Sequence, residues 1–464
     1  SFLLAAVTLS GCENWLDVKP ETEVNEDDMF NTEQGFMDAL YGIYVNMGKS
    51  DLYGGTLQTA LDMTAQYYSY YDISECPYGH YQTFEYEHPS CTAISDALWM
   101  RIYYCIGLTN NLLKYLDKPE AVQICSNYDY LRGEALALRA YLHFELIRIF
   151  APDVKKNPEY KSIPYRKTFS PDIEPQLKVK EVYQEILADL TEAKQLLSND
   201  VIRTNGPDWL GESEKKEESD DVTDKNEGYY TSDFLKTRKY RMNYYAVKAL
   251  MARAYMWKED YSKAKECAIE VIEEVADEKN PLFPLCTATY ADTASNDNMF
   301  ATEVLFSLYN SIRTDNIYKT YFTSDLNVVN LLTLAGGYQN GRIRTIFESP
   351  DDLRFKMWES VTKEGKEFCC FKKYAEVQTT TDEAKAKAER FAYMVPLIRV
   401  SELYLIAAEC VGVRERQVGI ALEKYLNPLR KARKCISLNT ESPTDLNTAI
   451  RNEYIREFIG EGQT

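Results

Sequence analysis

The sequence predicts an all-α, mainly helical protein in which tetratricopeptide-like helical hairpins form a short solenoid scaffold, elaborated by long loops. Apolar residues recur at intervals of three and four residues along several stretches, which is the period of one helix face. One stretch adds the small–aromatic–small spacing that lets two paired helices approach closely. Long polar segments without a regular period separate these stretches, and such segments are typical of loops.

The clearest helix precedes Pro152, which ends it. Two apolar faces run along this helix, so we expect it to pack between neighbouring helices. A second amphipathic helix follows a connection that is rich in proline. The pair lies near 131–197, and its apolar positions are Leu131, Ala135, Leu138, Leu142, Leu146 and Ile149 in the first helix and Val182, Ile186, Leu190, Ala193 and Leu197 in the second.

Two further hairpins are predicted, over 244–276 and near 399–433. In the first, Ala252, Tyr255 and Ala264 have the spacing of a tetratricopeptide repeat. The second is a weaker copy whose spacing is off by about one residue from the repeat pattern. Two or three such pairs are enough to stack as a short solenoid.

Composition limits the classes of function. The chain has 464 residues, of which 45% are hydrophobic and 27% charged, the proportions of a globular protein. Its net charge of −19 argues against nucleic acid, which favours basic surfaces. The eleven cysteines form no CxxC motif, and several lie in apolar periodic segments, so we expect them to be small buried side chains. With three histidines in the chain, we expect no metal site and no cofactor.

The segment Leu9-Ser10-Gly11-Cys12 has the features of a secretory signal that ends at a cysteine. The apolar residues over 2–9 are too few for a membrane span, which needs about 20, and small residues stand at the cleavage position. The pattern resembles the bacterial lipobox, in which the cysteine is acylated and becomes the mature N-terminus. We therefore expect 1–11 to be part of a lipoprotein signal peptide and 12–464 to be a single domain. The alternative is a chance Ser-Gly-Cys in an ordinary signal peptide.

Three loop-rich segments are expected to face a ligand, near 51–95, 200–235 and 283–350. Tyrosine is abundant, with 36 copies, and seven of them lie in the first segment between positions 67 and 86. A tyrosine ring offers an apolar face and a hydroxyl with few torsions to freeze, which suits sugar binding. The alternative is that these rings cover the core with their hydroxyls exposed. The predicted contacts in this segment are Tyr70, Tyr71, Tyr78 and Tyr81.

Trp209 is the best single candidate for a stacking platform. It follows the turn residues Asn205-Gly206-Pro207 and precedes a highly charged stretch, so neither side offers an evident core. The alternative is packing, which we expect for Trp99, Trp257 and Trp358.

The chain carries no common catalytic signature, since it contains no GxSxG, HExxH, P-loop or dinucleotide fingerprint. A carboxylate pair for glycoside hydrolysis stays open, because the separation of its members is spatial and not sequential. Glu453 and Glu457 lie four residues apart on a predicted helix and fit a surface feature equally well. We expect no enzyme activity.

Five short motifs, in order along almost the whole chain, resemble the SusD/RagB family of outer-membrane nutrient-binding lipoproteins of Bacteroidetes. They are specific together, although no single one is decisive. They are scaffold motifs, so they imply the fold and the anchor and assign no binding residue. The motifs are Trp15-Leu16-Asp17-Val18-Lys19-Pro20 after Cys12; Trp99, Tyr103 and Asn110; Arg132-Gly133-Glu134-Ala135 with Arg139-Ala140-Tyr141; Val395-Pro396-Leu397-Ile398-Arg399 leading to Glu402 and Tyr404; and Ile450-Arg451-Asn452-Glu453 with Glu457-Phe458 and Gly460-Glu461-Gly462.

The resemblance implies a lipid-anchored, surface-exposed protein of the outer membrane that captures an oligosaccharide or polysaccharide. Its implied partner is a SusC-like TonB-dependent transporter, to which it delivers the glycan without chemistry. The family signature normally continues beyond Gln463-Thr464, so the resemblance also implies a C-terminal truncation. The alternatives are a peptide- or glycoprotein-binding protein, a purely structural lid of the transporter and, as the weakest, a surface glycan hydrolase.

Overall fold

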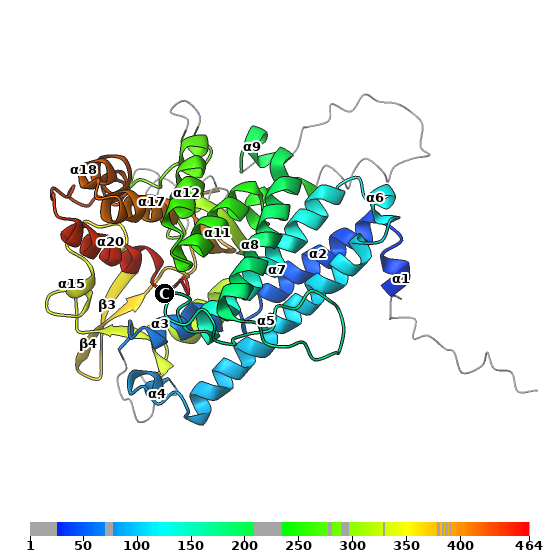
Figure 1. Cartoon of the computed structure of the whole chain (residues 1–464). Coiled ribbons are helices and arrows are strands. Elements are labelled where there is room, and N and C mark those ends of the chain that lie inside the picture. The colour runs from blue at the N-terminus through cyan, green and yellow to red at the C-terminus, as the bar shows by residue number, and fades with distance from the viewer. Residues whose placement is uncertain are drawn as a thin grey trace, which may run out of the picture.

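A computed structural model describes residues 26–69, 78–207, 234–276, 281–288, 297–327, 330–377, 381–382, 385, 388 and 391–463. Helices make up most of this part of the chain, so the predicted all-α, mainly helical class is confirmed (Figure 1). The shorter helices are α1 Glu26–Met29, α3 Thr56–Thr64, α4 Gly79–Gln82, α6 Ala121–Ile124, α9 Ile202–Asn205, α14 Lys319–Tyr321, α15 Ile343–Ile346, α18 Val418–Ala421 and α19 Asn427–Ala432.

The longer helices form the scaffold, each packed on the next (Figure 1). Contact between neighbours in a row is the arrangement of a helical solenoid. In order of packing the helices are α2 Glu33–Met47, α5 Pro89–Leu116, α7 Tyr128–Phe150, α8 Val179–Leu196, α11 Tyr244–Trp257, α12 Tyr261–Val275, α17 Val400–Ala408 and α20 Pro443–Phe458.

The helix predicted to pack on two faces is α7. Leu138 and Phe144, which belong to different faces, are both fully buried. The helix ends at Phe150, and Ala151 is extended with φ −121° and ψ 152°. A residue before a proline is disfavoured in the helical region, which is why Pro152 stops the helix one residue early. The predicted helix pair α7 and α8 is confirmed.

The hairpin predicted over 244–276 is α11 and α12. Each helix begins at a side-chain cap, because Asn243 accepts the N–H of Ala246 and Asp260 accepts that of Lys263. Glu259, in the turn between them, has a left-handed φ of 57°. This prediction is also confirmed.

The weaker hairpin near 399–433 forms as well, but both of its arms contain a π-helical turn. These turns span Glu409–Arg414 and Leu422–Leu426. A π turn holds more residues than an α turn, so it rotates every side chain that follows it. This rotation accounts for the displaced repeat spacing in the sequence.

Two small antiparallel sheets lie among the helices of the described chain. β1 Val304–Tyr309 pairs with β5 Met394–Arg399, while β4 Lys366–Phe371 lies between β2 Thr333–Ala335 and β3 Trp358–Lys363. The segment 283–350, expected to be loop, therefore supplies β1 and β2. All but the last residue of β1 are buried, so the strand lacks the polar–apolar alternation that would have revealed it.

Glu453 and Glu457 on α20 are buried, so the interpretation of this pair as a surface feature is wrong. The Glu457 carboxylate accepts hydrogen bonds from Arg354 at 2.8 Å, Arg399 at 2.9 Å and Arg433 at 2.7 Å. Burial alone would raise the pKa of Glu457, but these three guanidinium groups outweigh it and hold the pKa well below its usual range. The C-terminal motif thus belongs to a buried ionic network.

The described cysteines are all free. On β4, Cys369 joins the main core, while Cys370 joins a small cluster with Leu331 and Phe368. Cys105 and Cys410 are buried, as expected of cysteines in apolar periodic segments, whereas Cys267 is half-buried and packs against the core. Within the described residues, no helix combines the length and apolar character that a membrane crossing requires.

Candidate ligand-binding site

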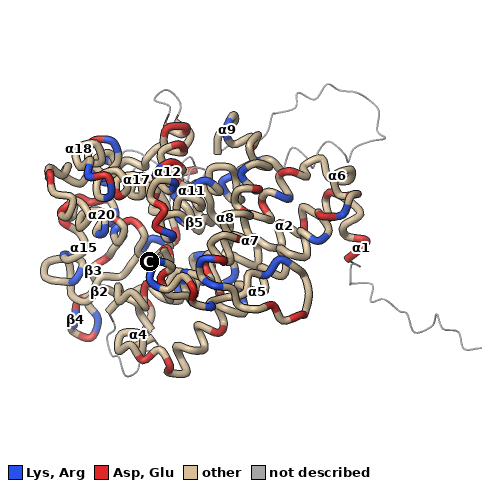
Figure 2. Tube along the Cα trace, viewed as in Figure 1, with Lys and Arg blue, Asp and Glu red and all other residues tan. Residues whose placement is uncertain are grey.

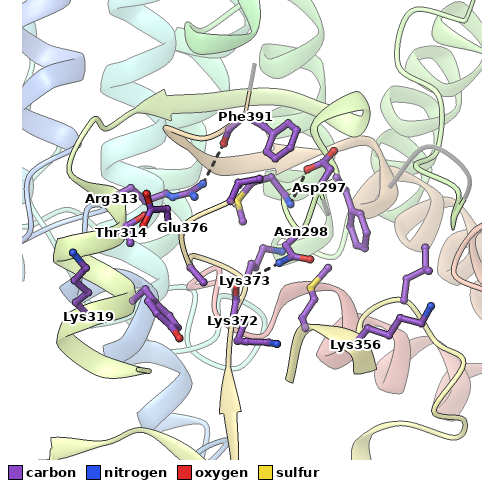
Figure 3. A pocket seen from close by; sticks show the side chains of 17 residues that line it. Asp297, Asn298, Arg313, Thr314, Lys319, Lys356, Lys372, Lys373, Glu376 and Phe391 are labelled. Atoms are coloured by element: carbon purple, nitrogen blue, oxygen red, sulfur yellow. Dashed lines mark hydrogen bonds between the residues drawn. The ribbon is translucent and has the colours of Figure 1, made fainter. Parts of the chain in front are cut away.

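A cavity of about 500 Å³ lies among the ends of the short strands (Figure 3). Cavities of this size are typical of small-molecule sites. Its walls are the turn 297–300, residues 313–319, the segment 353–357 that precedes β3, and the segment 372–377 that follows β4, with Phe391 on a further side. The first two walls belong to a segment that was expected to face a ligand.

Arg313 reaches the cavity wall because the chain turns directly after β1. The turn is held by Asn310, whose side-chain oxygen accepts the N–H of Ile312 at 3.0 Å. A π-helical turn, Thr314–Tyr318, starts immediately after Arg313. The guanidinium then extends toward the carbonyl oxygen of Phe391 (Figure 3).

Asp297 fixes the turn at another wall. Its carboxylate accepts the N–H groups of Met299 at 2.9 Å and Ala301 at 2.8 Å. Burial raises the pKa of Asp297 to about 6, against the lowering effect of these two hydrogen bonds. Its neighbour Asn298 donates to the carbonyl of Lys372 at 3.4 Å, which joins this turn to the end of β4.

The cavity is cationic although the chain is acidic. Five basic residues line it against two acidic ones, Asp297 and Glu376. Elsewhere, acidic and basic residues are interspersed along the helices (Figure 2), so this concentration of bases is local. Arg313 and Lys356 make no ion pair with another described residue. The other lining bases form the pairs Lys319–Asp315 at 2.6 Å, Lys372–Glu359 at 3.8 Å and Lys373–Glu461 at 2.5 Å.

The first and third of the segments expected to face a ligand meet beside this cavity. Tyr318 lines the cavity, and Tyr321, three residues later, packs against Tyr78 with ring centroids 5.9 Å apart. A β-bridge between Ser69 and Thr333 joins the same two segments, with an N–H to carbonyl distance of 2.7 Å. The two segments are therefore neighbours in space.

Two of the five predicted ligand contacts fall in the described chain. Tyr78 is half-buried, and its ring packs on the element that borders the cavity. Tyr81 is 5% exposed and packs into the main core, so its ring offers no open face and the prediction of a stacking contact there is wrong. Tyr70, Tyr71 and Trp209 lie outside the described residues.

Among the residues of this region that the structure describes, the exposed rings are Phe84 and Tyr86, at 63% and 43% exposure. They meet edge to face with centroids 6.2 Å apart, and Tyr86 also contacts Tyr81 at 6.1 Å. Phe84 has a left-handed φ of 61° just after α4, where the chain turns. Tyrosine abundance could not separate the covered rings of this segment from the open ones.

Trp257 is more open than its predicted packing role implies, since it is 42% exposed. It contacts Phe144 at 6.0 Å and lines a second hollow of about 260 Å³ together with Arg253. Packing is confirmed for Trp358, which is 1% exposed, and for Trp99, which is packed against the core.

The side chains of the main cavity offer charged and aromatic groups to a ligand. Lys356, Lys372 and Arg313 offer cationic donors, and Tyr318 offers a ring. In the described part of the chain, no group of three or more His, Cys, Asp or Glu side chains could hold a metal ion. The lysines belong to no sequence motif, so sequence reasoning had no signal by which to find them.

The structure is that of a helical-repeat protein with a cavity among its connecting segments. A family model described as starch-binding and associating with the outer membrane matches residues 14–206, and a model of the SusD family matches residues 360–464. The chain belongs to the SusD/RagB family, a family of binding proteins associated with the outer membrane. No curated protein matches it.

Solved structures with the same fold come from Bacteroides. A SusD superfamily protein from Bacteroides vulgatus is 21% identical, with a TM-score of 0.66 over 93% of this chain and 87% of that one. A SusD-like carbohydrate binding protein from the same organism is 19% identical, with a TM-score of 0.64 over 93% and 82%. A SusD superfamily protein from Bacteroides thetaiotaomicron is 20% identical, with a TM-score of 0.64 over 93% and 87%. At these identities the similarity bears on the fold.

Proposed function

We propose that this protein captures a glycan at the cell surface and passes it, chemically unchanged, to a TonB-dependent transporter of the SusC type. The observation that carries the proposal is the match of two SusD family models to opposite ends of the chain, one of them described as starch-binding and associating with the outer membrane. A cavity of about 500 Å³ bordered by aromatic residues supports it.

Capture would combine ring stacking with hydrogen bonds. The C–H faces of a sugar pack on aromatic rings, while its hydroxyls need polar partners. Two open rings, Phe84 and Tyr86, lie in the same segment as the half-buried Tyr78. Tyr86 replaces the covered Tyr81 among the proposed contacts, which are then Tyr70, Tyr71, Tyr78, Tyr86 and Trp209.

Attachment to the outer membrane would depend on Cys12. Acylation of this thiol after removal of residues 1–11 would hold the globular body at the surface, and more than one acyl chain is needed for a firm anchor. Substitution Cys12→Ser should abolish incorporation of labelled palmitate and release the protein from the membrane fraction. Labelling that persists in Cys12→Ser would contradict this anchor.

A glycan array tests the proposed binding. The soluble chain that starts after Cys12 should retain at least one class of glycan on the array. Affinity electrophoresis in a gel containing that glycan then locates the contacts, and Tyr86→Ala, Tyr78→Ala and Trp209→Ala should each reduce the retardation.

Tyr160→Ala is the matched control for this gel. Tyr160 is 56% exposed and lies outside all three segments expected to face a ligand, so its removal should leave the retardation unchanged. An array without any retained glycan would refute the proposed function. Retardation that survives all three aromatic substitutions would refute the proposed contacts alone.

A further inference from the structure

Among the described residues, every buried arginine except Arg313 forms an ion pair with a carboxylate. Ten arginines among the described residues are at least nine-tenths buried. Nine of them form ion pairs with buried or half-buried carboxylates. Arg313, in the wall of the main cavity, is 1% exposed and forms none with any described residue.

Most of these ion pairs also involve the same edge of the guanidinium group. The Nε and Nη2 donors point the same way and match the two oxygens of a carboxylate, which makes the contact bidentate. In most of the nine paired arginines, this edge binds one carboxylate through both donors. Examples are Arg139 with Asp189, Arg238 with Asp200, Arg253 with Glu402, Arg354 with Asp352 and Arg433 with Glu457.

In Arg313 the same edge makes no hydrogen bond to any residue that the structure describes. Its Nη1 donates to the carbonyls of Phe391 at 3.2 Å and Met394 at 2.9 Å, which fixes the plane of the guanidinium. Its Nε is buried without a hydrogen-bond partner, and its Nη2 donates to no described residue. Burial lowers the pKa of Arg313 to about 10, in contrast to the raised pKa of the buried Arg238 and Arg433.

No acidic residue that lines the cavity forms an ion pair with Arg313. The Asp297 carboxylate is occupied by two backbone N–H groups and makes no ion pair with Arg313. Glu376 is exposed at the rim and likewise makes no ion pair with Arg313. Lys356 adds a second cation without a carboxylate partner in the described chain. The charge of Asp297 acts on Arg313 electrostatically, but no described carboxylate contacts the guanidinium. Burying a cation without a contacting carboxylate is costly, so an anion that binds Arg313 would be strongly attracted to it.

We propose that the main cavity binds a negatively charged group of the ligand, a carboxylate or a sulfate on a sugar, at the Nε–Nη2 edge of Arg313. This inference rests on the proposed function and narrows its ligand to an acidic glycan. The anion would take the place that a carboxylate side chain takes on the other buried arginines. Tyr318 and Lys356, in the same cavity, would contact the sugar ring and add attraction for the charge.

The test compares matched pairs of polysaccharides by isothermal titration calorimetry. Polygalacturonate is set against its methyl ester, and dextran sulfate against dextran, so each pair differs in charge alone and the two pairs separate carboxylate from sulfate. The wild-type protein should bind the charged member of at least one pair at least about tenfold more tightly, as expected for a charge-assisted bidentate contact. Raising the salt from low to physiological concentration should weaken this binding.

Variants of the arginine complete the test. Arg313→Met should remove the preference for the charged member while keeping the affinity for the neutral one. Arg313→Lys retains the charge but loses the paired donors, so it should lose most of the preference for the charged polysaccharide. This variant also tests the role of Arg313 if Arg313→Met does not fold. Arg416→Met is the control, because it removes one exposed positive charge outside this cavity and should change nothing.

Two results would overturn the inference. If the wild-type protein bound the charged and neutral members of both pairs equally tightly, the proposal of an acidic ligand would be refuted, while the proposed capture of glycan would still stand. If folded Arg313→Met or Arg313→Lys kept the full preference for the charged polysaccharide, Arg313 would not be the residue that recognises the charge. Failure of every polysaccharide, together with an array that retains no glycan, would instead refute the proposed function.

Discussion

Glu457 illustrates how single residues hold this protein together. Its carboxylate receives hydrogen bonds from three arginines that come from distant parts of the chain. Substitution Glu457→Gln keeps the shape but leaves those guanidinium groups short of one buried counter-charge. We expect the free energy of unfolding, measured by chemical denaturation, to fall by about 3–5 kcal/mol. Glu423→Gln, an exposed control, should change it by no more than about 0.5 kcal/mol, and an equal effect of both would contradict the argument.

His143 gives the scaffold a pH-dependent stability. The ring is fully buried between a donor and an acceptor, because its Nδ1–H donates to the Arg139 carbonyl at 2.8 Å and its Nε2 accepts the Arg166 N–H at 3.0 Å. Burial lowers the pKa of His143 to about 3. As the pH falls below about 6.5, His143 becomes protonated in the unfolded chain but not in the folded one. The free energy of unfolding is therefore highest above about pH 6.5 and decreases at lower pH.

The slope of this effect can be measured. Between about pH 6 and pH 5, His143 should cost about 1.4 kcal/mol of unfolding free energy per pH unit. In His143→Gln, which does not titrate, the slope should be smaller by this amount. An unchanged slope in His143→Gln would show that this imidazole does not remain neutral in the fold.

At the scale of elements, glycines distinguish close packing from open surface within one hairpin. A Cβ atom on Gly412 would lie 2.2 Å from a side-chain carbon of Leu446 on α20 and 2.6 Å from the Cβ of Ala421. A Cβ on Gly419, in the other arm, would meet nothing within 4 Å. Gly412 thus lies where this hairpin and α20 approach each other closely.

The two alanine substitutions should therefore have opposite signs. Gly412→Ala should destabilise the protein by about 1–3 kcal/mol through overpacking. Gly419→Ala should stabilise it by up to about 1 kcal/mol, because alanine is the better helix former. Thermal unfolding of both variants checks this, and a Gly412→Ala protein as stable as the wild type would mean that the helices are not packed as described.

Elements with a local signal could be predicted from the sequence, whereas elements defined by long-range contacts could not. The helices α7, α8, α11 and α12 carry their apolar period in their own residues, and all four form as expected. The strand β1 was missed because burial on both faces erases its alternation. The burial of Glu457 depends on arginines from distant segments, so no local pattern could reveal it.

At the scale of the whole molecule, the candidate site was predicted in outline and not in detail. Two segments expected to face a ligand do meet, through Tyr78 and Tyr321. The cationic character of the cavity could not be foreseen, because Lys356 and Lys372 reach it only through the folding of the small sheets. The overall charge of −19 even pointed away from it. The charge of a cavity depends on which segments the fold brings together, and this cannot be read from the overall composition.

On the proposed function, a rigid helical frame presents a cavity and open rings that bind glycan without altering it. The most direct measurement is isothermal titration calorimetry of the soluble protein with the glycan retained on the array, followed by assay of the recovered glycan for new reducing ends. We expect saturable binding and a glycan of unchanged length. New reducing ends, or heat no different from that of buffer alone, would contradict it.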